Sequence, residues 1–247
     1  MPYYVPARSH VDRLANLKAA KAADLADFAQ NKRSLSDATI SRLGIITIYE
    51  PVVLAIATAE AKRSLEVSQK NAKYAKLLAF IRDYWEGLKR RTGRLDHDAS
   101  VLLFASLPLT GDVPGIPNEA AAVAFAKQIA KGDNDMFTAG FPKMSNPTGP
   151  EVEAARIAYE AEQDDIAPAD SALDAALAAA QGMVFDVDDI LEDVRAEVAH
   201  FNRKLDDPSI RRALRRYGMH FATNPGEPEE DPADNGTPPP APTPPPA

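Results

Sequence analysis

Two stretches of the chain repeat apolar residues at the spacing of one buried helix face. Their members recur at i, i+3, i+4, i+7, i+11 and i+14, which places all of them on one side of an α-helix. The first ladder contains Tyr74, Leu77, Leu78, Ile81, Trp85 and Leu88, and the second contains Val187, Ile190, Leu191, Val194, Val198 and Phe201. We therefore predict an all-α protein in which each ladder is the core-facing side of one helix.

The segments that precede the two ladders follow the same order. In each, an aspartate and a phenylalanine close an opening helix, a polar loop follows, and a hydroxyl residue begins the next helix. These residues are Asp24, Phe28 and Ser36 before the first ladder, and Asp133, Phe137 and Thr148 before the second. The shared order favours an internal duplication, which predicts two tandem, similar helical-bundle halves.

Composition sets the expected boundaries of these halves. We predict a first bundle half over residues 1–104 and a connector over residues 105–117, which hold three prolines and two glycines. A second bundle half with a short C-terminal helix is expected over residues 118–221. Residues 222–247 are dominated by proline, glycine and acids, and we expect a disordered proline-rich tail there.

Individual helices are predicted from composition and from stop signals. His10–Asn31 has no glycine or proline and is a strong helix candidate. Pro51 is expected to interrupt the next long helical stretch, because proline lacks a backbone donor and clashes with the preceding turn. Residues 45–48 are β-branched, but no second strand is evident to pair with them. A short helix is expected from the cap Asp207 to Gly218.

Residue types argue against several classes of enzyme. The chain has no cysteine, which excludes disulfides, thiolate metal sites and a cysteine nucleophile, and it has only four histidines. It also lacks the glycine-rich turns that bind phosphates and the Gly-x-Ser-x-Gly elbow of hydrolases. We therefore expect a protein that is not an enzyme and needs no cofactor.

Two segments have residue spacings typical of metal sites. Glu197 and His200 have the Glu-x-x-His spacing of a carboxylate di-metal bundle, but no second pair of this kind is present. The acidic segment from Asp186 to Glu197 resembles a calcium loop, yet Leu191 stands where such a loop needs glycine. Glu197 and His200 are thus weak candidates for metal ligands, and a solvated helix is expected instead.

Charge is distributed unevenly. Residues 61–94 hold ten Lys and Arg against three Asp and Glu, whereas residues 95–207 hold seven against twenty-two. Basic clusters of this kind can contact the phosphates of nucleic acid, although the acidic stretch opposes a long polyanion. The candidate contacts are Lys89, Arg90, Arg91, Arg94, Arg211, Arg212, Arg215 and Arg216.

The location of the protein is predicted from its apolar segments. Met1–Arg8 lacks the basic and apolar regions of a secretory signal. Residues 43–59 form the most apolar run, but they are short for a membrane span and contain Glu50 and Pro51. We expect this run to be core, with no membrane contact, in a cytoplasmic protein.

Three segments carry a loose resemblance to a group of bacterial all-helical repeat proteins of unknown function. They are the loop beginning at Gly132-Asp-Asn-Asp-Met-Phe, the Arg211-Arg-Ala-Leu-Arg-Arg-Tyr-Gly helix, and Gly226-Glu-Pro in the tail. The resemblance covers about residues 35–221 and implies a fold, but no activity or catalytic residue. From the residues we expect a non-enzymatic helical scaffold or protein-interaction module with an unknown protein partner or self-association. The alternatives are a nucleic-acid-associated protein and, with less support, a metal-dependent bundle.

Overall fold

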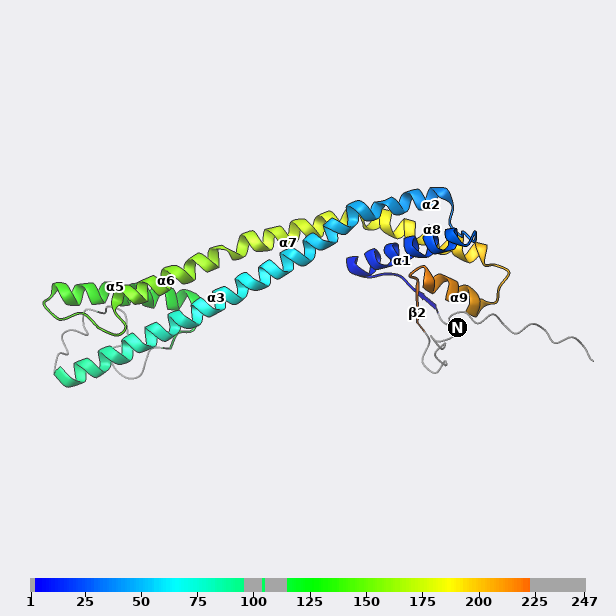
Figure 1. Cartoon of the computed structure of the whole chain (residues 1–247). Coiled ribbons are helices and arrows are strands. Elements are labelled where there is room, and N and C mark those ends of the chain that lie inside the picture. The colour runs from blue at the N-terminus through cyan, green and yellow to red at the C-terminus, as the bar shows by residue number, and fades with distance from the viewer. Residues whose placement is uncertain (1–2, 96–103, 105–114, 223–247) are drawn as a thin grey trace, which may run out of the picture. The chain divides into compact units, whose positions relative to one another are not determined.

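The computed structural model describes residues 3–95, 104 and 115–222. These residues are mostly α-helical, which confirms the predicted all-α class, and two short strands are added to it (Figure 1). The chain divides into two compact units. Unit 1 comprises Met1–Ile56 and Ala176–Ala247, and unit 2 comprises Ala57–Ala175.

Each unit combines segments that are far apart in the sequence. Unit 1 contains β1 (Tyr3–Val5), α1 (His10–Ala29), α2 (Asp37–Arg42), the 3₁₀ turn η1 (Leu43–Ile45), the start of α3 (Ile46–Leu95), the end of α7 (Ile166–Gln181), α8 (Val184–Phe201), α9 (Asp207–Arg216) and β2 (His220–Ala222). Unit 2 contains the rest of α3, then α5 (Glu119–Thr138), α6 (Gly149–Asp164) and the first part of α7.

The core of unit 1 lies where α1, α3 and α8 pack together. Leu17 from α1, Tyr49 from α3 and Val194 from α8 are all fully buried in one cluster. The second ladder supplies α8's side of this core from Val187 to Val198. Phe201 is an exception, because its side chain is 54% exposed and the helix ends there. The ladder therefore predicted the buried face of α8 correctly for all but its last member.

The core of unit 2 is built from α3, α5 and α6. Leu77, Ile81, Trp85 and Leu88 of the first ladder are buried in it, and Tyr74 and Leu78 pack against it. Trp85 is 5% exposed, which confirms that it is a core residue. Phe104 closes the same cluster and lies directly against Gly132, where an added Cβ would approach its ring within 2.3 Å.

Several helix boundaries differ from the sequence-based expectation. The helix α3 continues through Pro51, where an interruption was predicted, and runs without a break to Leu95. A proline removes only one backbone hydrogen bond, and the buried side chains of Tyr49 and Val53 anchor the helix on both sides of it. The N-cap position of the short C-terminal helix is held by Asp206 rather than Asp207, without a capping hydrogen bond from its side chain. Gly218 follows this helix with a positive φ of 86°, as its role as a helix stop requires.

The strands β1 and β2 were not predicted. They pair antiparallel with Tyr3 opposite Ala222 and Val5 opposite His220. Three-residue strands carry too little alternation to be recognised in a sequence. They join the start of the described chain to its end within unit 1.

The compact units divide the chain differently from the predicted boundaries at residues 104 and 118. The helix α3 runs for 50 residues without a turn, so its first ladder cannot fold back onto the core that its own beginning forms. The ladder at Leu77–Leu88 packs instead with α5 and α6, and the ladder of α8 packs with α1. The predicted connector and tail lie largely outside the described residues.

Candidate functional site

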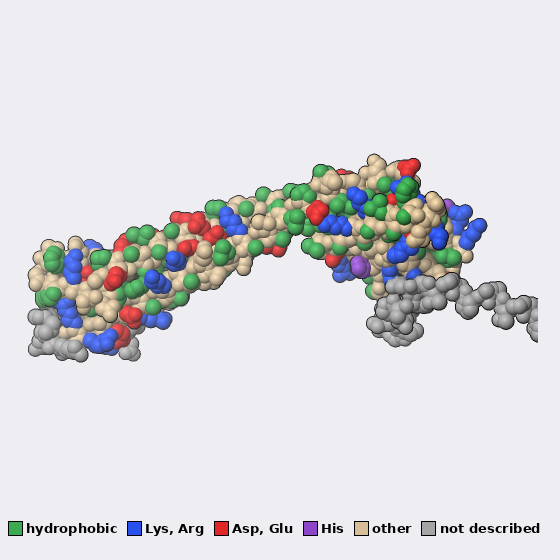
Figure 2. All heavy atoms as spheres, viewed as in Figure 1, with side chains coloured by type: hydrophobic (Ala, Val, Ile, Leu, Met, Phe, Trp, Pro, Cys, Tyr) green, Lys and Arg blue, Asp and Glu red, His purple; other side chains and the backbone are tan. Residues whose placement is uncertain are grey.

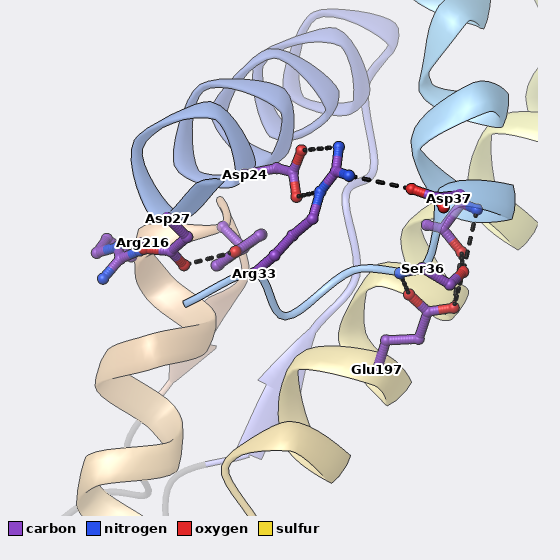
Figure 3. A network of polar contacts seen from close by, with 9 residues as sticks. Asp24, Asp27, Arg33, Ser36, Asp37, Glu197 and Arg216 are labelled. Carbon is purple, nitrogen blue, oxygen red and sulfur yellow. Dashed lines mark hydrogen bonds and ion pairs between the residues drawn. The ribbon is translucent and has the colours of Figure 1, made fainter. Parts of the chain in front are cut away.

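A network of charged side chains joins four helices at one end of unit 1 (Figure 3). Asp24, near the end of α1, is 3% exposed and accepts two hydrogen bonds from Arg33, at 3.1 and 3.2 Å. Arg33 also donates to Asp37 at the start of α2, at 3.0 Å. The arginine therefore links the end of α1 to the beginning of α2 through the loop that carries it.

Asp27, one helical turn after Asp24, connects α1 to the C-terminal segment. Its carboxylate accepts a hydrogen bond of 2.7 Å from the hydroxyl of Tyr217 and forms an ion pair with Arg216. Burial and the bond to Asp27 raise the pKa of Tyr217 above its ordinary value. The tyrosine is therefore a hydrogen-bond donor that stays protonated, not an acid.

Glu197 of α8 caps the N-terminus of α2. Its carboxylate accepts hydrogen bonds from the backbone N–H of Ser36 at 2.7 Å, the Ser36 hydroxyl at 2.8 Å and the Thr39 hydroxyl at 2.8 Å. Burial raises the pKa of Glu197, but these bonds outweigh burial and lower it below its ordinary value. A carboxylate at this position also satisfies donors that the helix itself leaves unpaired.

Unit 2 has one fully buried carboxylate, Asp133, among the residues that the structure describes. It accepts hydrogen bonds from the Tyr84 hydroxyl at 3.0 Å and from the backbone N–H groups of Met144 and Gly149 at 3.1 and 3.2 Å. A Cβ on Gly149 would lie 2.6 Å from that of Asp133, so glycine is required for this close approach. Asp133 thus fixes the loop between α5 and α6 to α3.

The chemistry of these groups is structural. In the described parts of both units, each buried aspartate accepts two or three hydrogen bonds from other helices or loops. The pKa values of Tyr84 and Tyr217, which donate to Asp133 and Asp27, are raised above the ordinary value. These contacts hold helix ends and loops together within each unit.

The candidate metal pair is not brought together as a site. Glu197 is turned toward Ser36 and Thr39 in α2, whereas the exposed imidazole of His200 contacts Arg203. The acidic segment that resembles a calcium loop is helical, as its apolar ladder predicted. Its carboxylates instead pair with arginines: Asp188 with Arg13, and Asp189 and Asp193 with Arg42.

A different acidic group was missed by the sequence analysis. Glu66 of α3, Glu162 of α6 and Asp165 each place one carboxylate oxygen within 4.8 Å of the others. Their separation in the sequence gives no motif, so no sequence signal could have found them. The Nζ of Lys73 lies 3.8 Å from Glu162 and supplies compensating positive charge.

The two basic clusters lie in different units. Lys89 and Arg90 are exposed near the end of α3, and Arg91 donates to the backbone carbonyl of Pro142 and so supports the loop before α6. The side chain of Arg94 lies outside the described residues. In this cluster Arg91 therefore supports the fold of unit 2, whereas Lys89 and Arg90 are exposed.

The arginines of α9 are also engaged within unit 1. Arg216 pairs with Asp27, Arg212 donates to Ser209 at 2.7 Å, and Arg215 stacks on Phe221 with 5.6 Å to the ring centroid. Arg211 is half-buried on the same helix. These contacts explain why basic residues gather at the C-terminal end of a helix, where cations are also favoured by its dipole.

An uncharged stripe runs along the outward side of α3 in unit 2. Its members recur at alternating spacings of three and four residues, so they share one helix face about 32 Å long. All of them are exposed: Thr58, Ala61, Leu65, Ser68, Ala72, Ala75 and Ala79. Leu65 is 54% exposed, as is Ile157 on α6. Figure 2 shows hydrophobic side chains of this kind among the charged ones on the visible surface.

The same helix carries the most apolar segment of the chain. By length and composition, the helical stretch Asp37–Thr92 is sufficient to cross a membrane, and 28% of its most apolar 18-residue window is buried. A mostly buried core helix of a soluble protein meets the same criterion of length and composition. Leu43, Ile46 and Tyr49 from the predicted core run are buried, whereas Ile48 and Leu54 are exposed.

Comparisons with protein-family models, with curated proteins and with solved structures found no match to this chain.

Proposed function

We propose that this protein is a non-enzymatic helical scaffold or protein-interaction module built from two similar halves. The observation that carries the proposal is the uncharged stripe of α3, whose seven residues lie along one helix face and are all exposed. Five of its seven members are apolar, namely Leu65 and four alanines, and packing them against another helix removes that surface from water. The stripe thus offers a surface on which a helix of a protein partner can lie.

The buried polar groups support the same proposal. Asp24, Asp27 and Asp133 are used to fix loops and helix ends. Such networks make the units rigid, and a rigid surface loses little entropy when a partner binds. The distribution of side chains therefore suits recognition better than catalysis.

Two alternatives have less support. A nucleic-acid-associated protein would use the two basic clusters, but Arg91, Arg212 and Arg216 already contact other groups of their own units. A metal-dependent bundle would use Glu197 and His200, but the Glu197 carboxylate is occupied by donors from α2.

The proposal is tested by capturing partners with three forms of the full-length protein. Leu65→Glu places a charge in the middle of the stripe, and Ala167→Glu places the same charge on an exposed position of α7. Both positions are exposed, so melting temperatures should stay within about 2 °C of the wild type. Protein partners cross-linked to the wild type should persist with Ala167→Glu and be lost with Leu65→Glu.

An identical set of cross-linked proteins in all three samples would contradict the proposal. DNA titrations at several salt concentrations separate the main alternative. A log affinity that falls steeply with log salt, and that is abolished by Arg90→Glu, would favour nucleic-acid binding instead.

A further inference from the structure

Both compact units are assembled from both halves of the chain. In unit 1, Arg13 pairs with Asp188 and Ser36 donates to Glu197, so α1 and α2 are held by α8. In unit 2, Tyr84 donates to Asp133, so α5 is held by α3. Neither unit has a complete core without the other half of the sequence.

The opening helices of the two halves are alike in detail. Both α1 and α5 have 20 residues, and each begins after a cap, Ser9 or Asn118, whose side chain accepts a hydrogen bond from the backbone three residues later. Each places a buried aspartate at its fifteenth residue and an exposed phenylalanine at its nineteenth. These residues are Asp24 and Phe28 in α1, exposed by 3% and 60%, and Asp133 and Phe137 in α5, exposed by 1% and 59%.

The similarity extends to the surroundings of the phenylalanines and to the next helix. Arg33 stands over the Phe28 ring at 5.0 Å from its centroid, and Lys143 stands over the Phe137 ring at 4.8 Å. The following helices are both capped by hydroxyl side chains that accept a bond from the third residue of the turn. These caps are Ser36 and Thr148.

The helices that carry the two ladders, α3 and α8, are the closing helices of the two halves, and they also correspond to each other. Three equivalent ladder positions are buried in both helices: Leu77 and Ile190, Ile81 and Val194, and Trp85 and Val198. The last position differs, since Leu88 is buried and Phe201 is exposed. Each ladder packs on the first two helices of the other half. The first ladder packs on α5 and α6, and the second ladder packs on α1 and α2. A long continuous α3 enforces this exchange, because it carries its ladder away from its own opening helix.

From these observations we infer that the two halves are copies of one module with exchanged closing helices, and that the chain is a covalently fused dimer. The partner that each half fits is therefore a second copy of the same module, and the connector only raises the effective concentration of one half near the other. The halves recognise each other through their own surfaces. This inference does not depend on the proposed scaffold function.

The test begins with a protease site inserted at residues 105–114 of the full-length protein. The native protein is cut to completion and examined by size-exclusion chromatography with light scattering and by circular dichroism. Both fragments should elute together at the mass of the uncut chain and keep its helical signal, because both cores span the cut. Separation of the fragments at micromolar concentration, whether folded or unfolded, would overturn the inference.

A matched pair of substitutions in the uncut chain tests the exchange itself. Ile81→Ala and Val194→Ala both truncate a β-branched apolar side chain to a methyl group, at equivalent ladder positions that are 2% and 0% exposed. In hydrogen–deuterium exchange, Ile81→Ala should accelerate exchange at least threefold more in α5 than in α1, and Val194→Ala should do the opposite. The reverse pattern would mean that each ladder serves its own half, and equal acceleration would mean that the cores are not separate. Either result overturns the inference.

Discussion

Tyr217 donates a hydrogen bond to Asp27 across 190 residues of chain, and both side chains are buried. This contact ties the end of α9 to α1 within unit 1. Tyr217→Phe keeps the ring but leaves one carboxylate oxygen of Asp27 without this donor, so we expect a loss of about 1–3 kcal/mol. Urea titration followed by circular dichroism measures it. Tyr3→Phe is the control, since Tyr3 is 55% exposed and should change stability by less than about 0.5 kcal/mol.

Asp133 provides a second test of the buried networks. Asp133→Asn places an amide NH₂ among the N–H and O–H donors of Gly149, Met144 and Tyr84, so at least one donor loses its acceptor. We expect unfolding to become easier by about 2–4 kcal/mol. Asp135→Asn, in the same helix but paired with Lys131 at the surface, should stay within about 0.5 kcal/mol. Similar losses in both variants would refute the buried role of Asp133.

The stability that Glu197 contributes should depend on pH. Its folded pKa lies below the ordinary value of 4.5, so its contribution is complete above that pH and disappears as the pH falls through the folded pKa. Glu197→Gln should therefore be less stable than the wild type near about pH 7, and the difference should shrink below about pH 4. Denaturant titrations at both pH values decide this. A difference that grows in acid has the wrong sign for this account.

His10 should respond to pH in a related way. Its Nδ1 lies 2.9 Å from the buried Tyr49 hydroxyl, and burial, aided by Arg13 and opposed by Asp188, lowers the pKa of His10 below its ordinary value of 6.5. The neutral ring is thus favoured by folding, and stability is lost as the pH falls below 6.5 through the folded pKa. His10→Gln should weaken the dependence of the melting temperature on pH between about pH 7 and pH 5. A dependence on pH that is unchanged in His10→Gln would contradict this account.

Trp85 and Phe201 test how far the ladders describe the cores. Trp85→Ala empties a buried site and should cost about 3–5 kcal/mol. Phe201→Ala removes a ring that is 54% exposed and should cost less than about 1 kcal/mol. Equal losses would mean that the end of α8 is buried in solution.

The helical class and the buried faces were predictable because they are local properties. Period and composition predict an amphipathic helix from neighbouring residues, as for α1 and for the ladders of α3 and α8. Capping has the same character, and Ser36 and Thr148 both cap as expected. The prediction was wrong for Phe201, because a helix face is buried only as far as the helix that packs against it extends.

The arrangement of the units and their polar networks was not predictable in this way. Which helix a ladder packs against depends on whether α3 turns back on itself. Pro51 predicted an interruption of α3, but the helix continues because Tyr49 and Val53 are buried on either side of the proline. The bond from Tyr217 to Asp27 joins distant segments and leaves no motif. The sequence pointed to Glu197 because of its spacing from His200, but the groups that donate hydrogen bonds to it belong to Thr39 and Ser36, which are 158 and 161 residues away.

The most direct test of this account is a disulfide between the two ends of unit 1. The chain has no cysteine, so Tyr3→Cys with Ala222→Cys introduces a single possible bridge between residues that oppose each other in β1 and β2. If both ends fold into one unit, the dilute protein should form an intrachain disulfide, and its free energy of unfolding should rise by about 2–4 kcal/mol when oxidised. Cysteines that stay reduced under mild oxidation, or a bridge that lowers stability, would contradict the assembly of unit 1 from the two ends of the chain.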